Sequence, residues 1–129
     1  MPTGMPATTG DVLSSTMYNS LTAFTVGSAQ TADYTAVLAD QYQVLQLMNK
    51  ATAIAFKIPT NASVAFPVGT VITVLNIGAG VCTISAVTSG TTTVLSAGAT
   101  AASPTLAQYK SAACIKTGTD TWFIVGAIG

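Results

Sequence analysis

The sequence of 129 residues contains no histidine, glutamate or arginine, and charged residues make up only 6% of it, against about 25% in an average soluble domain. Four aspartates balance four lysines, so the net charge is zero. A chain without a basic surface has no electrostatic means of attracting nucleic acid or an anionic membrane. We therefore expect neither of these partners.

The missing residue types also restrict the chemistry that the chain can perform. Without histidine a Ser–His–Asp arrangement cannot form, and no motif around Lys57 or Lys116 supports a Ser–Lys pair. Two cysteines without a histidine are too few for a tetrahedral zinc site within one chain. The aspartates fall at turns or beside a predicted helix cap, whereas paired carboxylates act in one pocket. We predict that the chain is not an enzyme and that it binds no metal or other cofactor.

Hydrophobic residues make up half of the chain, but Ala and Val alternate with Thr and Ser. A transmembrane helix needs about 20 predominantly apolar residues in a row, and we expect none. The N-terminus, "MPTGMPATTGDV", has no basic region followed by an apolar core, so we expect no secretory signal. A low-charge surface at zero net charge gives little protection against self-association. We therefore expect other protein to cover much of the surface.

The N-terminal residues 1–26 predict an attachment and oligomerisation segment. Residues 1–10, rich in Pro, Gly and Thr, indicate an extended arm. The spacing of four apolar residues then predicts one face of a short helix, with Ser14 or Ser15 as its N-cap. These candidate attachment residues are Leu13, Met17, Leu21 and Phe24. A helix of about ten residues is marginal alone, so it must dock on its own domain or on a neighbouring subunit.

A polar connector over residues 27–33 precedes a predicted β-domain over residues 34–129. Short segments with a period of two, separated by turn signals every eight to twelve residues, indicate about eight to ten strands. The predicted fold is all-β: a single antiparallel sandwich or barrel-like domain that follows the extended arm and short helix.

Two strand predictions are specific enough to check. Residues 34–48 indicate two strands around a turn near residues 39–41, with Tyr42, Val44 and either Leu45 or Leu47 competing for the core face. Residues 71–76 form a strand with Val71, Thr73 and Leu75 on one face and Ile72, Val74 and Asn76 on the other.

Cys82 and Cys114 lie in apolar strand-like segments and are predicted to be buried thiols, with a disulfide left open if their strands are neighbours. Trp122 could stack on a sugar but is predicted to fill the core. The charge-free stretch of residues 59–80 is predicted to be buried on one face and lined with Thr, Ser and Ala on the other. Such small uncharged side chains lose little entropy on ordering, which favours subunit contact over catalysis.

Several motifs occur in an order that resembles a β-domain of tailed-bacteriophage virion proteins. The resemblance spans about residues 33–127, and its most specific parts are "NASVAFPVGT" and "GAG". The other matching segments are "YTAVLAD", "MNKATAIAFKIP", "TIS", "QY", "IKTGTDTW" and "VG". The N-terminal "GDV", followed by Ser15 and Asn19, is similar to segments that precede fibre and appendage domains in phage proteins.

The resemblance implies a structural protein of the virion, since such domains occur in tail fibres, tailspikes and neck appendages, often as homotrimers. With one arm, one helix and one β-domain, the chain fits a small capsid decoration or appendage subunit attached through its N-terminal arm. Its expected partners are copies of itself and capsid, neck or tail proteins, and its expected location is the virion, assembled in the host cytoplasm. The alternative is a receptor- or glycan-binding module of a tail fibre.

Overall fold

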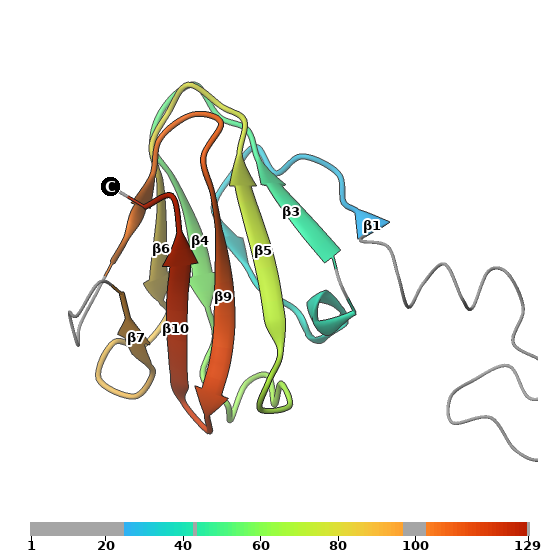
Figure 1. The fold of residues 1–129 in the computed structure, drawn as a ribbon, viewed down its shortest axis with the longest axis vertical. Coiled ribbons are helices and arrows are strands. Elements are labelled where there is room, and N and C mark those ends of the chain that lie inside the picture. The colour runs from blue at the N-terminus through green and yellow to red at the C-terminus, as the bar shows by residue number, and fades with distance from the viewer. Residues whose placement is uncertain (1–24, 43, 97–102, 129) are drawn as a thin grey trace, which may run out of the picture.

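The computed structural model describes residues 25–42, 44–96 and 103–128, which form two packed β-sheets (Figure 1). The elements are β1 (Thr25–Val26), β2 (Tyr34–Thr35), the 3-10 helix η1 (Leu38–Gln41), β3 (Val44–Met48), β4 (Ile54–Ile58), β5 (Val71–Asn76), β6 (Cys82–Ala86), β7 (Thr93–Leu95), β8 (Thr105–Leu106), β9 (Ser111–Gly118) and β10 (Thr121–Gly126). The prediction of an all-β fold is confirmed.

The two sheets divide the strands in a regular way. Sheet A has the order β1-β3-β5-β9-β10-β7, and sheet B has the order β2-β4-β6-β8. From β1 to β9 the chain therefore alternates between the sheets, and each connection carries it across the core to the opposite layer.

The predicted antiparallel pairing is wrong for much of the molecule, because both sheets are mixed. The pairs β1–β3, β3–β5, β2–β4, β4–β6 and β7–β10 are parallel, whereas β5–β9, β9–β10 and β6–β8 are antiparallel. Parallel strands usually need a helical crossover. Here a strand of the opposite sheet takes the place of the crossover helix between two parallel neighbours, as β4 does between β3 and β5. Short turns are therefore sufficient to connect the strands.

One strand of sheet A and the following strand of sheet B together form one winding of the chain, and successive windings stack on one another. Leu45 pairs with Thr73 in sheet A, and Ile54 pairs with Cys82 in sheet B, in both cases 28 residues apart. Between the strands, the "GAG" turn lies directly on residues 50–52: a Cβ atom on Gly80 would lie 1.8 Å from the carbonyl oxygen of Thr52. Only glycine allows this backbone approach. The turn is a step between layers, not a reversal within one sheet.

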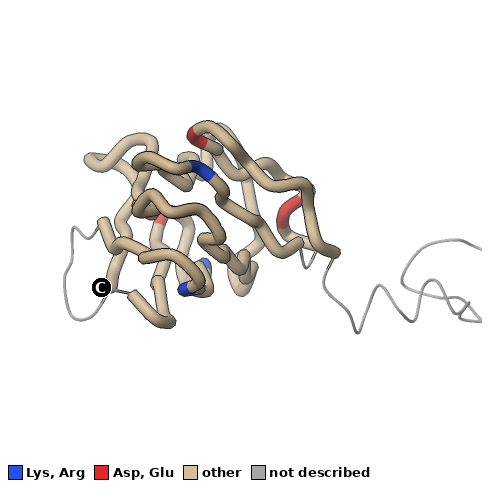
Figure 2. The backbone as a smooth tube through the Cα atoms, turned by 90° about the horizontal axis from the view of Figure 1, so that it is seen from above, with Lys and Arg blue, Asp and Glu red and all other residues tan. Residues whose placement is uncertain are grey.

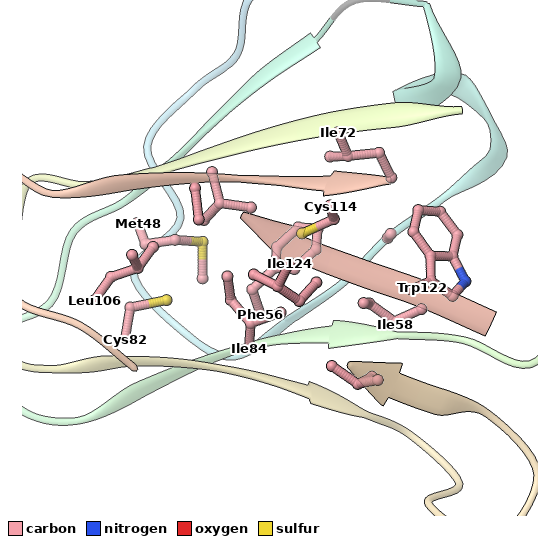
Figure 3. Packing of buried hydrophobic residues seen from close by; sticks show 14 of the residues in the cluster. Met48, Phe56, Ile58, Ile72, Cys82, Ile84, Leu106, Cys114, Trp122 and Ile124 are labelled. Carbon is pink, nitrogen blue, oxygen red and sulfur yellow. The ribbon is translucent and has the colours of Figure 1, made fainter. Parts of the chain in front are cut away.

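The core lies between the sheets and receives side chains from both (Figure 3). In β4 the alternating residues Ile54, Phe56 and Ile58 are buried, and in β5 Ile72, Val74 and Asn76 face inward, as the alternation predicts. Trp122 is 1% exposed, which confirms its core position. Cys82 in sheet B and Cys114 in sheet A are buried free thiols.

The prediction for β3 left two faces open, that of Val44 and that of Leu45 or Leu47, and the structure buries the face to which Val44 belongs. Gln46 and Met48 point into the core, whereas Leu45 and Leu47 lie on the opposite, outer face of sheet A. Tyr42, which follows η1, is 70% exposed. The polar Gln46 is accepted inside because its amide donates a 2.7 Å hydrogen bond to the buried carboxylate of Asp40.

The β-domain begins earlier in the chain than predicted. Thr25 and Val26 pair with β3, although they fall in the predicted attachment segment. The predicted linker also joins the sheet, because the amide of Gln30 donates to the carbonyl of Leu47 and its carbonyl accepts from the amide of Asn49. Residues 25–33 are thus the first winding of the fold.

Candidate interaction surface

The predicted attachment face lies outside the described residues. Leu13, Met17, Leu21 and Phe24 all precede β1, so the expected helix stays a prediction. A different surface, on the folded domain, has the character expected of a contact region: the outward side of sheet A.

The outward side of sheet A carries three mainly apolar rows, which together are called the outer face of sheet A. Strand register places Val71, Ile115, Phe123 and Leu95 side by side across β5, β9, β10 and β7. A second row runs across β1, β3, β5, β9 and β10 and consists of Val26, Leu45, Thr73, Ala113 and Val125.

Large apolar side chains on this face contact water. The exposed fractions are 40% for Val71, 42% for Phe123 and 48% for Val125. A third, shorter row consists of Leu47 on β3, Leu75 on β5 and the polar Ser111 on β9. The face is more apolar than the Thr-, Ser- and Ala-lined surface predicted for the charge-free stretch, because valine and leucine occupy the outward positions of β3 and β5.

The outward side of sheet B is different in character. Its register rows are Thr35–Lys57–Ser85 and Ala55–Thr83–Thr105, which are mostly polar. Lys57 lies 4.0 Å from Asp33 in an exposed ion pair. One sheet therefore presents hydroxyls and charges to solvent, while the other presents an apolar surface.

Charge is absent from the outer face of sheet A. Among the strands of this sheet, the only charged residue is Lys116, and its side chain points into the core, 2% exposed. The other described charged residues, which Figure 2 colours along the backbone, lie in sheet B or in connections. A surface without charge can contact protein with little electrostatic desolvation cost.

Within the described residues, the edges of both sheets are poorly suited to strand addition. The edge strands are β1 and β7 in sheet A, with two and three residues, and β2 and β8 in sheet B, with two residues each. Very short edge strands are a common protection against edge-to-edge pairing. The face of sheet A, and not its edges, is the candidate contact region.

A buried polar cluster ties together two of the stretches that carry the phage resemblance. The Nζ atom of Lys116 donates to the Oδ1 atom of Asn61 at 2.6 Å and to the carbonyl of Phe66 at 2.7 Å. The Phe66 ring packs edge-on against Trp122, with ring centroids 5.6 Å apart. Burial lowers the pKa of Lys116, and the nearby charge of Asp120 opposes that effect. These residues hold the turn "NASVAFP" against β9 and β10, which is a structural role.

The described aspartates also have structural roles, because each accepts a hydrogen bond from a backbone amide. Asp33 accepts from Ala55 at 2.9 Å, Asp40 from Val37 at 3.0 Å, and Asp120 from Asn61 at 2.8 Å. Asp40 additionally accepts from the Tyr34 hydroxyl at 2.8 Å. The aspartates lie in separate clusters, an arrangement that offers no pair of carboxylates for acid–base work.

The structure gives an important role to a residue that the sequence placed only on one face of its strand, with Ile72 and Val74. Asn76 is fully buried, and its Nδ2 atom donates to the carbonyls of Gly80 and Leu106, each at 2.8 Å. Its Oδ1 atom accepts from the amide of Gly78 at 3.1 Å. An asparagine that ends a β-branched strand just before "GAG" was the available signal for this turn-holding role.

The described part of the chain offers little support for a binding platform of another kind. It contains no group of three or more metal-ligating side chains, and no helix in it is long and apolar enough to span a membrane. The exposed tyrosines are far apart in the fold, since Tyr42 follows η1 and Tyr109 lies in the turn before β9, at opposite ends of the strands (Figure 1). They do not form a joint surface on which a sugar could stack.

Comparisons with protein families, with curated proteins and with solved structures found no match to this chain.

Proposed function

We propose that the chain is a structural subunit of a tailed-bacteriophage particle. In this proposal it forms a homotrimer that decorates the capsid or projects from the particle as a small appendage, attached through the segment that precedes β1. The observation that carries the proposal is the uncharged, apolar outer face of sheet A, which is typical of a surface that other protein covers.

Two further observations support an assembly role over catalysis. The described aspartates and Lys116 are engaged in hydrogen bonds that hold turns in place. Among the motif residues behind the phage resemblance, Phe66 packs against Trp122, and Lys116 donates hydrogen bonds to both Asn61 and the carbonyl of Phe66. The resemblance therefore concerns residues that maintain the fold, and the function lies in the surface that the fold presents.

The proposal is tested on the particles themselves. Virions from a culture that produces the chain are purified on a density gradient, analysed by mass spectrometry and labelled with antibody coupled to gold. We expect the chain to sediment with DNA-containing particles, and gold to mark the capsid, neck or tail. Recovery of the chain only from the soluble cell fraction, with unlabelled particles, would contradict a structural role in the virion.

A deletion tests the mode of attachment. A chain that starts at residue 25 keeps β1 and all described pairings. We expect it to fold and to lose binding to particles that lack their own copy. Unchanged binding would show that the β-domain itself makes the attachment. Specific, saturable binding on a glycan array would instead favour the alternative, a glycan-binding module of a tail fibre.

A further inference from the structure

We infer that the outer face of sheet A is the surface through which copies of this chain contact one another. The inference deepens the proposed function, because it identifies the surface that joins the subunits of the proposed homotrimer. It concerns the purified chain in solution, so it can be tested separately from any location on a particle.

The position of the exposed apolar residues shows that the face is incomplete without a cover. Phe123 on β10 lies between Ile115 of β9 and Leu95 of β7, and yet it is 42% exposed. Val125, further along β10, pairs with Ala113 of β9 and is 48% exposed. Val71 on β5 is 40% exposed between β3 and β9. Large apolar side chains are therefore exposed in the interior of the sheet and not only at its edges.

The size of the face is suited to an interface. The six strands of sheet A have 30 residues in total, and at about 3.3 Å per residue and about 4.8 Å between strands they give a face of about 480 Å² in flat projection. The largest apolar patches on monomers are about 300–600 Å² and are often functional. A standard interface buries about 800 Å² of accessible surface per partner. The accessible area of the face exceeds its flat projection, because side chains protrude from it and the turns beside the strands add to it.

The absence of charge favours a copy of the same chain as the occupant. Specific partners usually meet through complementary charges, which suppress incorrect partners. The outer face of sheet A has no charge to offer such a partner and would leave any opposing charge desolvated and unpaired. A second copy brings the same uncharged surface. Because the net charge is zero, copies also approach one another without long-range repulsion.

The helix predicted for the N-terminal segment would by itself be too small to cover the face. The predicted helix that carries Leu13, Met17, Leu21 and Phe24 has about ten residues, so it is about 15 Å long and about 10 Å wide. It would shield about 150 Å², roughly a third of the projected area. Most of the face would still be in contact with water.

Native mass by light scattering after size exclusion tests the inference, with Phe123→Lys and Val125→Lys in the full chain. At a self-interface each substitution brings identical charges together in a desolvated contact. We expect an oligomer for the unchanged chain and a shift to the monomer mass of 12.9 kDa for both variants, with association weakened about tenfold or more. Thr83→Lys is the matched control, since it places the same charge on an outward position in the middle of sheet B; it should remain oligomeric.

Three results would overturn the inference: a monomeric unchanged chain, oligomers that survive both substitutions on sheet A, or dissociation by Thr83→Lys to the same extent. Near-UV circular dichroism of the buried Trp122 establishes that each variant is folded. If the lysine variants do not fold, Val125→Cys and Thr105→Cys provide the second test by maleimide labelling, because the native thiols are buried. Protection of residue 125 that is lost on dilution, with residue 105 always reactive, supports the inference; equal reactivity overturns it.

The outcomes separate this inference from the proposed function. An oligomer held by the outer face of sheet A, from a chain that is absent from virions, would support the inference and contradict the virion role. A chain that is found on virions but purifies as a monomer, or that stays oligomeric in the sheet A variants, would support the virion role and contradict the inference.

Discussion

The Nδ2 atom of Asn76 lies 2.8 Å from the carbonyl oxygen of Gly80 and donates a hydrogen bond to it, inside the turn that carries the chain from β5 to β6. A second bond from the same atom reaches Leu106, which is 30 residues further along the chain. Asn76 thus joins the "GAG" turn to β8. Where the chain crosses from one sheet to the other, its side-chain amide supplies the hydrogen bonds to the carbonyls of Gly80 and Leu106.

Replacement of Asn76 by alanine should destabilise the domain strongly. The carbonyls of Gly80 and Leu106 would lose their side-chain donor inside the protein, and an unsatisfied buried polar group costs about 1–3 kcal/mol. We expect the free energy of unfolding to fall by about 2–4 kcal/mol, measured by urea denaturation with Trp122 fluorescence. Asn49→Ala, at an exposed position, is the control and should change it by less than about 0.5 kcal/mol. Equal effects of the two substitutions would contradict this role.

Gly80→Ala should be among the most damaging single-methyl changes in the chain. The added Cβ would lie 1.8 Å from the carbonyl oxygen of Thr52, so the stacked turns would have to separate. We expect a loss of about 3 kcal/mol or more, or no soluble folded protein. Gly90→Ala is the matched control, because its Cβ would meet no atom within 4 Å. A thermal midpoint for Gly80→Ala close to that of Gly90→Ala would show that the turns are not in close contact.

Lys116→Met should loosen the turn that contains Asn61 and Phe66. The substitution keeps most of the side-chain volume but leaves the carbonyl of Phe66 and the Oδ1 atom of Asn61 without their buried donor. We expect a loss of about 2–4 kcal/mol in unfolding free energy. The exposed Lys110→Met serves as control. Hydrogen exchange should show the loss at the amides of Ser63 and Val64, and an unchanged exchange rate there would argue against the role of Lys116.

Stability should decrease in alkaline solution as buried thiols and a tyrosine resist ionisation. Burial raises the pKa of Cys82 from 9.0 to about 11, and burial also raises the pKa of Cys114 and, together with Asp40, that of Tyr34. Because the unfolded chain releases these protons first, the free energy of unfolding falls as the pH rises above about 9. The lowered pKa of Lys116 acts in the opposite direction.

A variant isolates the contribution of one thiol. Between pH 9 and 11, the slope of unfolding free energy against pH should be less steep for Cys82→Ala than for the unchanged chain. The difference should approach about 1.4 kcal/mol per pH unit. Urea denaturation at several pH values provides the slopes, and the cavity left by the substitution affects all points alike. Parallel slopes would show that Cys82 ionises normally in the folded state.

The alternation of side chains along each strand could be predicted from the sequence, because a period of two is a local property. It correctly divided the residues of β5 between two faces, of which the structure buries the one with Ile72, Val74 and Asn76. It did not determine which strands are neighbours. A turn such as "GAG" has the same residue types whether it reverses the chain within a sheet or crosses to the other one, so parallel pairing could not be anticipated.

The inward face of β3 shows a second limit of sequence reasoning. Leu45 and Leu47 are more apolar than Gln46, and a ranking by apolarity places them inside. The structure places them on the outer face of sheet A because Asp40 holds Gln46 in the interior. That network involves Tyr34, Asp40 and Gln46 from three separate elements, and this tertiary relationship is not visible in the local pattern. The sequence predicted subunit contact for the charge-free stretch that includes β5, but not that β3, β9 and β10 extend the same face.

The alternation of the chain between two sheets has a consequence for how the domain can form. Only β9 and β10 are joined as a hairpin; among the described strands, every other pairing closes a loop of at least 18 residues, and the contacts of β3 with β5 and of β4 with β6 close 28. Because the entropy cost of closing these loops must be met before the contacts stabilise the chain, we expect refolding in milliseconds to seconds. Stopped-flow fluorescence measures the rate, and refolding in less than a millisecond would contradict this expectation. The pairing of β5 with β9 then joins the early strands to the hairpin formed by residues 111–126.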